Sequence, residues 1–79
     1  MEIKVLGPGC KKCKDLDQRV REVLAENNLD ANVEKIEDIG EIVQYGVMIT
    51  PGLVIDGQVK MSGRVPSKEE IKKFIEEVK

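Results

Sequence analysis

Two cysteines three residues apart, Cys10 and Cys13, lie where a strand pattern gives way to a helix pattern. Before them, residues 2–6 alternate apolar and polar side chains and run into Gly7-Pro8-Gly9, which predicts a short strand ending at a chain breaker. After them, apolar residues recur at helical spacing, which predicts a helix from about Lys11 or Lys12 to Asn27 or Asn28. A disulfide across two residues closes a very short loop and removes little entropy from the unfolded chain. The pair is therefore better placed for chemistry than for stability.

Two capping boxes predict two further helices. Asp38 with Glu41 three residues later opens a short helix, and Gly46 is a natural stop for it. Ser67 with Glu70 opens the last helix of the chain. The apolar side chains of that helix recur at helical spacing at Ile71, Phe74, Ile75 and Val78.

The remaining segments predict strands. Residues 31–36 form one, and residues 53–55 and 58–61 form a hairpin around Asp56-Gly57, because a type I′ turn needs positive φ at both central positions. The predicted order is βαβαββα, so the fold class is α/β, with a four-stranded mixed sheet and helices on both faces. We expect the first and third helices on one face and the second on the other. We expect residues 1–79 to form a single domain.

Composition limits the possible partners. Apolar residues make up 41% of the chain, with one Phe, one Tyr and no Trp, so the core must be aliphatic. The formal charge is only −2, which argues against a nucleic-acid partner, since such a partner requires a clustered basic excess. No segment approaches the ~20 apolar residues of a membrane span, and the N-terminus lacks the pattern of a signal peptide. We therefore expect a cytoplasmic monomer with no membrane partner.

The Cys10-Lys11-Lys12-Cys13 segment suits thiol chemistry. The first cysteine falls at a helix N-terminus, where free N–H groups and the helix dipole favour a thiolate. Lys11 and Lys12 add positive charge that lowers the thiol pKa further. We expect Cys10 to attack a substrate disulfide as nucleophile and Cys13, which should be more buried, to resolve the mixed disulfide. Such chemistry requires no cofactor.

Other roles for the pair stay open at this point. The two cysteines could form an inert structural bridge. Zinc is disfavoured because the chain has no histidine and no second cysteine pair. A copper-chaperone-like module also places C-x-x-C after its first strand, and two thiolates suit Cu(I). Its element order is βαββαβ, however, whereas this chain ends in a helix. A metal- or metalloid-binding module and a non-catalytic adaptor remain the alternatives.

The combination of motifs resembles a known family. The C-x-x-C pair at a helix start, the Tyr45–Gly57 segment with its Thr50-Pro51 dipeptide, and the later segments 62–65 and 67–71 resemble the small archaeal and bacterial thioredoxin-like proteins, also described as glutaredoxin-like or redox-active disulfide proteins. The resemblance covers essentially the whole chain. It implies a compact thioredoxin fold and a protein disulfide oxidoreductase that is supplied with electrons by an upstream reductase.

The resemblance also implies a role for Thr50 and Pro51. In that family the matching proline is cis and lies against the disulfide, which leaves the backbone of the preceding residue free to pair with an extended substrate. Proline also tolerates the start of an edge strand, and the residues alone do not separate these two roles. Met48 and Ile49 could form an apolar contact surface beside the sulfurs or belong to the core.

The chain departs from larger relatives at several positions. Thioredoxins carry a buried acid on the first strand, and Lys4 stands at that position here, where we expect a solvated side chain. They also carry Trp before the first cysteine and Gly-Pro between the two. Glutaredoxins hold glutathione with a Gly-Gly-x-x-Asp element, where this chain has Ser62-Gly63-Arg64-Val65-Pro66.

Overall fold

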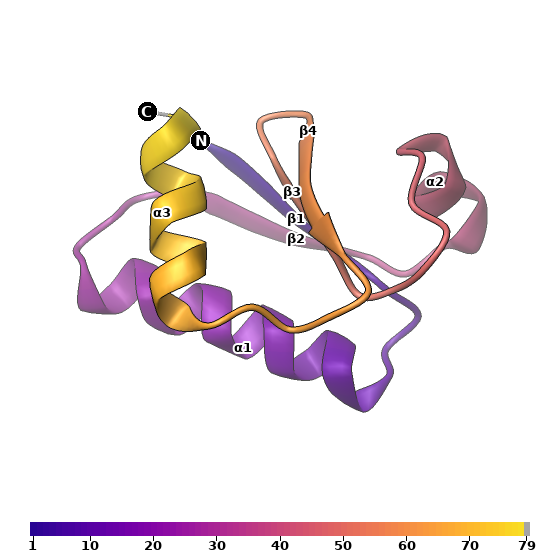
Figure 1. Ribbon diagram of the computed structural model, residues 1–79, viewed down its shortest axis with the longest axis horizontal. Coiled ribbons are helices and arrows are strands. Elements are labelled where there is room, and N and C mark those ends of the chain that lie inside the picture. The colour runs from indigo at the N-terminus through magenta and orange to yellow at the C-terminus, as the bar shows by residue number, and fades with distance from the viewer. Residues whose placement is uncertain (79) are drawn as a thin grey trace.

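The strands form one four-stranded sheet in the order β2-β1-β3-β4 (Figure 1). The computed structural model describes residues 1–78. In it β1 (Glu2–Leu6) pairs parallel with β2 (Asn32–Ile36) and antiparallel with β3 (Gly52–Ile55). The hairpin partner of β3 is β4 (Gln58–Ser62). The predicted βαβαββα order and the mixed sheet are confirmed.

Three helices complete the fold: α1 (Lys11–Glu26), α2 (Ile39–Gln44) and α3 (Lys68–Val78). α1 and α3 pack together on one face of the sheet, and the short α2 lies beyond the other face near its edge (Figure 1). This is the predicted distribution of the helices. No helix within residues 1–78 has the length and apolar character needed to cross a membrane.

Local hydrogen bonds fix the element ends as the sequence predicts. The Asp38 Oδ1 accepts from the backbone N–H of Gly40 at 2.7 Å and from that of Glu41 at 3.3 Å. Among the described residues no bond returns from the Asp38 N–H to the Glu41 side chain, so Asp38 caps α2 without the full capping box that the sequence predicts. The backbone N–H of Glu70 donates to Ser67 Oγ at 3.2 Å, and the backbone N–H of Ser67 donates back to Glu70 Oε1 at 3.4 Å. This reciprocal pair is a capping box at the start of α3.

The hairpin turn has the conformation that its sequence predicts. Asp56 and Gly57 have φ values of 48° and 82°, so both central residues are left-handed, as a type I′ turn requires. The turn matches the right-handed twist of the two strands that it joins. It therefore fixes the pairing of β3 with β4.

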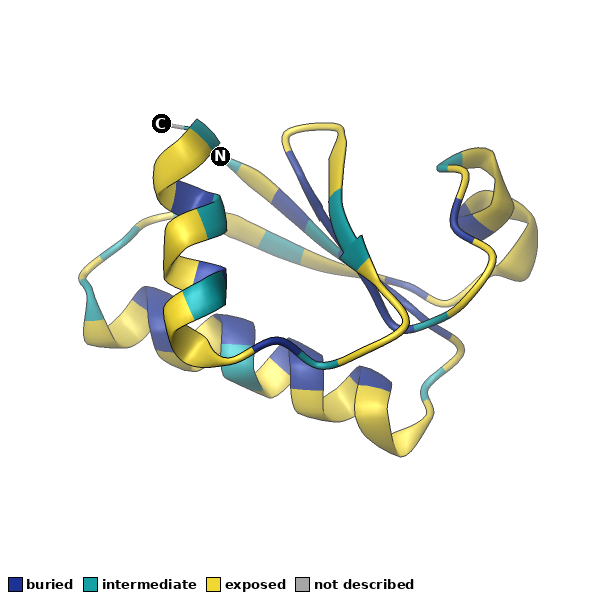
Figure 2. Cartoon of the chain, viewed as in Figure 1, coloured by how far each residue is buried: buried dark blue, intermediate teal, exposed yellow. Residues whose placement is uncertain are grey.

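The core is divided by the sheet (Figure 2). Every residue of β3 is buried, whereas the two edge strands are largely exposed. One cluster lies under α1 and α3, and its fully buried members include Leu16, Leu53 and Ile71. A smaller cluster under α2 includes Leu6, Ile42 and Val54. Because β1 and β3 contribute to both clusters, they are the structural centre of the molecule.

Candidate redox site

Cys10 is the N-cap of α1. Its backbone is extended, with φ −67° and ψ 168°, and its Sγ accepts from the backbone N–H of Cys13 at 3.3 Å. The residue is exposed. The sulfur therefore lies at the positive end of a sixteen-residue helix, where a free N–H group and the helix dipole favour negative charge.

Cys13 lies one turn further along α1 and forms a disulfide with Cys10, with a Cα–Cα distance of 5.1 Å. Its side chain is only 4% exposed, on the same helix face as Leu16 and Val20. The two sulfurs thus differ in access although they are bonded. One faces the solvent and the other faces the interior.

Gly7 lies directly against the buried sulfur. A Cβ placed on Gly7 would overlap Cys13 Sγ and lie 2.9 Å from Cys13 Cβ, closer than side chains approach each other. The same Cβ would lie 3.8 Å from the Cβ of Thr50. Gly7 therefore provides the space in which the Cys13 sulfur sits between the end of β1 and the segment before β3.

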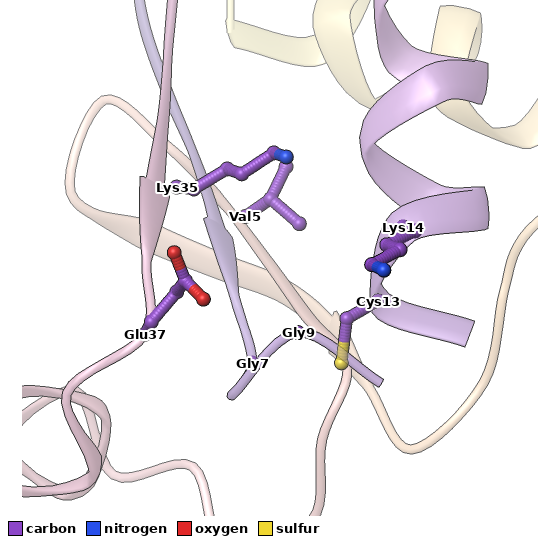
Figure 3. A pocket seen from close by; sticks show the side chains of 7 residues that line it. All are labelled: Val5, Gly7, Gly9, Cys13, Lys14, Lys35 and Glu37. Carbon is purple, nitrogen blue, oxygen red and sulfur yellow. The ribbon is translucent and has the colours of Figure 1, made fainter. Parts of the chain in front are cut away.

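A cavity of about 60 Å³ opens beside Cys13. Figure 3 shows Cys13 and Lys14 reaching its edge from α1, and Lys35 and Glu37 from the side of β2. Lys35 Nζ also lies 3.7 Å from a carboxylate oxygen of the buried Asp17. The buried sulfur thus borders a small cavity whose lining includes charged side chains of both signs.

Thr50 and Pro51 lie directly before β3. The peptide bond between them is cis, and Pro51 is fully buried, with its carbonyl accepting from the backbone N–H of Gly63 at 2.8 Å. Thr50 is half-buried and lies beside Cys13 across Gly7. The structure therefore brings Thr50 to the cysteine pair.

Met48 and Ile49 extend this segment on the outside. They are 89% and 66% exposed, so the alternative that they belong to the core is wrong. Only two residues separate Met48 from Pro51. An apolar surface therefore adjoins Thr50.

Lys11 and Lys12 occupy the first turn of α1, and both are exposed. Neither borders the cavity beside Cys13, and neither makes an ion pair with any residue of the described part of the chain. They add positive charge at the helix end that carries Cys10.

Lys4 and Tyr45 form a contact that differs from the expectation of a solvated Lys4. Lys4 Nζ donates to the Tyr45 hydroxyl at 2.9 Å. The pKa of Lys4 is raised above its ordinary value, chiefly by this contact with Tyr45 and less by Glu34 and Glu2. The contact lies on the face of the sheet that carries α2 and has no part in the cysteine site.

Comparison with known proteins identifies the family. A sequence model described as the thioredoxin domain matches residues 1–76. The chain belongs to the thioredoxin family. It is 44% identical over 75 residues to a thioredoxin of Methanothermobacter thermautotrophicus, covering 95% of this chain and 97% of that one. It is 38% identical over 70 residues to a thioredoxin of Methanocaldococcus jannaschii, covering 89% and 80%.

Membership of the thioredoxin family, together with a bonded C-x-x-C pair at a helix N-terminus, makes the protein a thiol–disulfide oxidoreductase. The family resemblance and the activity predicted from the sequence are thus confirmed.

Sequence reasoning missed three residues of this site: Gly7, Lys35 and Glu37. Gly7 counted only as a chain breaker, although a glycine directly after the strand that precedes C-x-x-C is a usable signal for close packing. Lys35 and Glu37 carry no local signal, because only the pairing of β2 with β1 brings them to α1.

Proposed function

We propose that the protein exchanges its Cys10–Cys13 disulfide with disulfides of partner proteins, with Cys10 as the nucleophile and Cys13 as the resolving cysteine. The difference in access between the two sulfurs carries this assignment. Cys10 is exposed at the helix cap, whereas Cys13 is 4% exposed beneath it. A partner disulfide of several residues can reach the first sulfur and not the second.

The exchange balances in two steps. The Cys10 thiolate attacks one sulfur of the partner disulfide, so that a bond between Cys10 and the partner forms and the partner's other sulfur leaves as a thiolate. The Cys13 thiolate then attacks Cys10 Sγ, which forms the Cys10–Cys13 disulfide and releases the second partner thiolate. Two electrons pass to the partner, and the two protons lost by the cysteines end on the partner thiols.

Lys11 and Lys12 act in this proposal by lowering the thiol pKa of Cys10, because they place two positive charges in the turn that the thiolate caps. Their effect adds to that of the helix dipole. It increases the fraction of Cys10 that is reactive at neutral pH.

Thr50 and Pro51 form the substrate-binding edge. Thr50 lies outside β3, and neither its backbone nor its side chain hydrogen-bonds with the residues that the structure describes. An extended partner segment can therefore pair with the Thr50 backbone beside the sulfurs. The exposed Met48 and Ile49 give the same segment an apolar contact.

The chain works in this proposal as one monomeric domain of residues 1–79 in the cytoplasm. Its partners are proteins with disulfides and an upstream reductase that returns the oxidised pair to dithiols, with no organic cofactor bound to this chain. The relatives named thioredoxin support the two classes of protein partner.

Separate serine variants of the two cysteines test the assignment. Cys10→Ser should lose nearly all reduction of a protein disulfide, whereas Cys13→Ser should react once and remain trapped as a mixed disulfide, which mass spectrometry of the non-reduced adduct detects. Alkylation of the wild-type protein in redox buffers should give a reversible potential between roughly −120 and −270 mV.

Two outcomes contradict the proposal. One is full activity in Cys10→Ser with none in Cys13→Ser, which would reverse the roles. The other is tight Cu(I) binding by the wild-type protein with no disulfide exchange, which would favour the metal-binding alternative.

A further inference from the structure

The positive charges of this protein are unevenly neutralised. Away from the cysteines, most cationic side chains form ion pairs with carboxylates. Arg21 and Lys35 pair with Asp17, Lys60 with Glu77, Arg64 with Glu70, and Lys68 with Glu26. Within residues 1–78, Arg19 donates to the Pro66 carbonyl instead of a carboxylate, and five lysines other than Lys4 make no ion pair. Two of these, Lys72 and Lys73, lie on α3. The other three are Lys11, Lys12 and Lys14, in the first turn of α1 beside the cysteines.

Around the cysteine pair, positively charged side chains outnumber negatively charged ones. The first turn of α1 contains no acidic residue. Glu37 borders the cavity beside Cys13, but it shares that cavity with Lys14 and Lys35. Asp15, one residue beyond Lys14, is exposed. The carboxylate of Asp17 already forms ion pairs with Arg21 and Lys35.

We propose that the three lysines of this turn select partners whose reactive disulfide is flanked by acidic side chains. The inference rests on the proposed function, since it concerns the partner that the exposed Cys10 attacks. The chain as a whole carries −2 and would repel an acidic protein at long range. Charges closer than a Debye length, about 8–10 Å at moderate salt, decide the final approach. A carboxylate next to a partner cysteine falls within that distance of Lys11 and Lys12.

The expected consequence is a preference in rate. Complementary charge at a contact raises the association rate and fades as salt screens it. An acidic partner segment should therefore react faster than a basic one at low ionic strength, and the two should converge at high ionic strength. A disulfide without charge should show little dependence on salt.

Three probes test the preference with the pre-reduced full-length protein. Two are synthetic disulfide peptides of one sequence, in which the residues beside each cysteine are either Asp or Lys. The third is hydroxyethyl disulfide, which is small and uncharged. Single-turnover rate constants are measured at about 20 mM and about 500 mM salt, and each peptide rate is divided by the rate for the uncharged probe. This division removes any change in the reactivity of the Cys10 thiolate itself.

The wild-type protein should reduce the Asp peptide roughly tenfold faster than the Lys peptide at low salt, with the ratio approaching one at high salt. The double variant Lys11→Glu/Lys12→Glu should reverse the preference. The matched control is Lys72→Glu/Lys73→Glu, which changes the net charge equally on α3 and should keep the wild-type ratio. Lys11→Gln/Lys12→Gln removes the charges without reversal and should bring the ratio toward one.

The contrary results separate this inference from the proposed function. If the wild-type protein reduces hydroxyethyl disulfide but treats both peptides alike, the charge preference is wrong and the exchange activity stands. If the α3 control changes the ratio as much as the α1 variants, net charge and not this turn is responsible. If no probe is reduced, the proposed function itself fails.

Discussion

Gly7 is the residue whose identity the buried sulfur depends on most directly. We predict that Gly7→Ala lowers the free energy of unfolding by roughly 1–3 kcal/mol, because the added methyl group would overlap the Cys13 side chain and force it to move. The displacement should also slow attack on the mixed disulfide, roughly ten- to a hundredfold, since this step requires close alignment of the sulfurs. Urea unfolding and the lifetime of the mixed disulfide measure the two effects.

Gly46→Ala is the control for Gly7→Ala, because it replaces a glycine that lies away from the cysteines. Gly46 has φ 81°, and no atom lies within 4 Å of the position that an added methyl group would take, so the substitution costs backbone strain without touching the cysteines. It should lower stability by about 1 kcal/mol and leave the lifetime of the mixed disulfide unchanged. An equal slowing in both variants would show that general destabilisation, and not the position of the Cys13 sulfur, controls the resolving step.

At the scale of the elements, the start of α3 couples stability to pH. Glu70 accepts from the Arg64 guanidinium at 2.6 Å, and this contact holds the pKa of Glu70 below its usual range. A carboxyl group whose pKa is lowered by folding stabilises the folded state above its ordinary pKa, and this contribution disappears as the pH falls through the lowered value. Because the pair is largely exposed, the contribution should be modest.

Glu70→Gln removes the charge and keeps a side chain suited to the capping box. We predict a lower urea midpoint than wild type at pH 7, with the difference closing as the pH falls through the lowered pKa of Glu70, below which the wild-type side chain is protonated in both the folded and the unfolded state. Glu69→Gln removes a charge from the same turn without removing an ion pair, so its loss at pH 7 should be smaller. A Glu70→Gln difference that persists unchanged in acid would assign the effect to packing.

The elements that the sequence predicts well are those fixed by neighbouring residues. The Ser67–Glu70 capping box, the Asp38 cap and the Asp56-Gly57 turn act within three or four residues, so their signals can be recognised in the chain itself. The burial of Cys13 follows in the same way from its phase on α1 beside Leu16. Element ends shift by a residue, as at α1, which ends at Glu26 because Asn27 caps it.

The arrangement of the whole molecule supplies what local patterns do not contain. The cavity beside Cys13 exists because β2 pairs with β1 in a register that brings Lys35 opposite Val5, close to α1. The contact between Lys4 and Tyr45 joins residues forty-one positions apart. Both depend on pairing between distant segments, and a single sequence carries no record of that register.

The two halves of the core should unfold together, because the central strands β1 and β3 each contribute side chains to both. Leu53 and Val54 are neighbours on β3 and point to opposite faces, Leu53 toward α1 and α3 and Val54 toward α2. We predict that Leu53→Ala lowers the free energy of unfolding by about 2–5 kcal/mol and Val54→Ala by about 1.5 kcal/mol or more. A domain of this size is stable by only about 4–12 kcal/mol, so either loss is a large fraction.

Cooperativity is the decisive measurement for these variants. Far-UV circular dichroism measures the loss of helical structure. Alkylation of Cys13 in the reduced protein measures the exposure of the buried face of α1. In each variant both signals should move to the same lower midpoint, as in a two-state transition. Ile39→Ala on the exposed surface of α2 should change the midpoint little, because Ile39 is 66% exposed. Val54→Ala could instead shift the circular dichroism transition alone and leave Cys13 protected from alkylation. The α2 side would then unfold as a separate unit, and the central strands would not couple the two halves of the core.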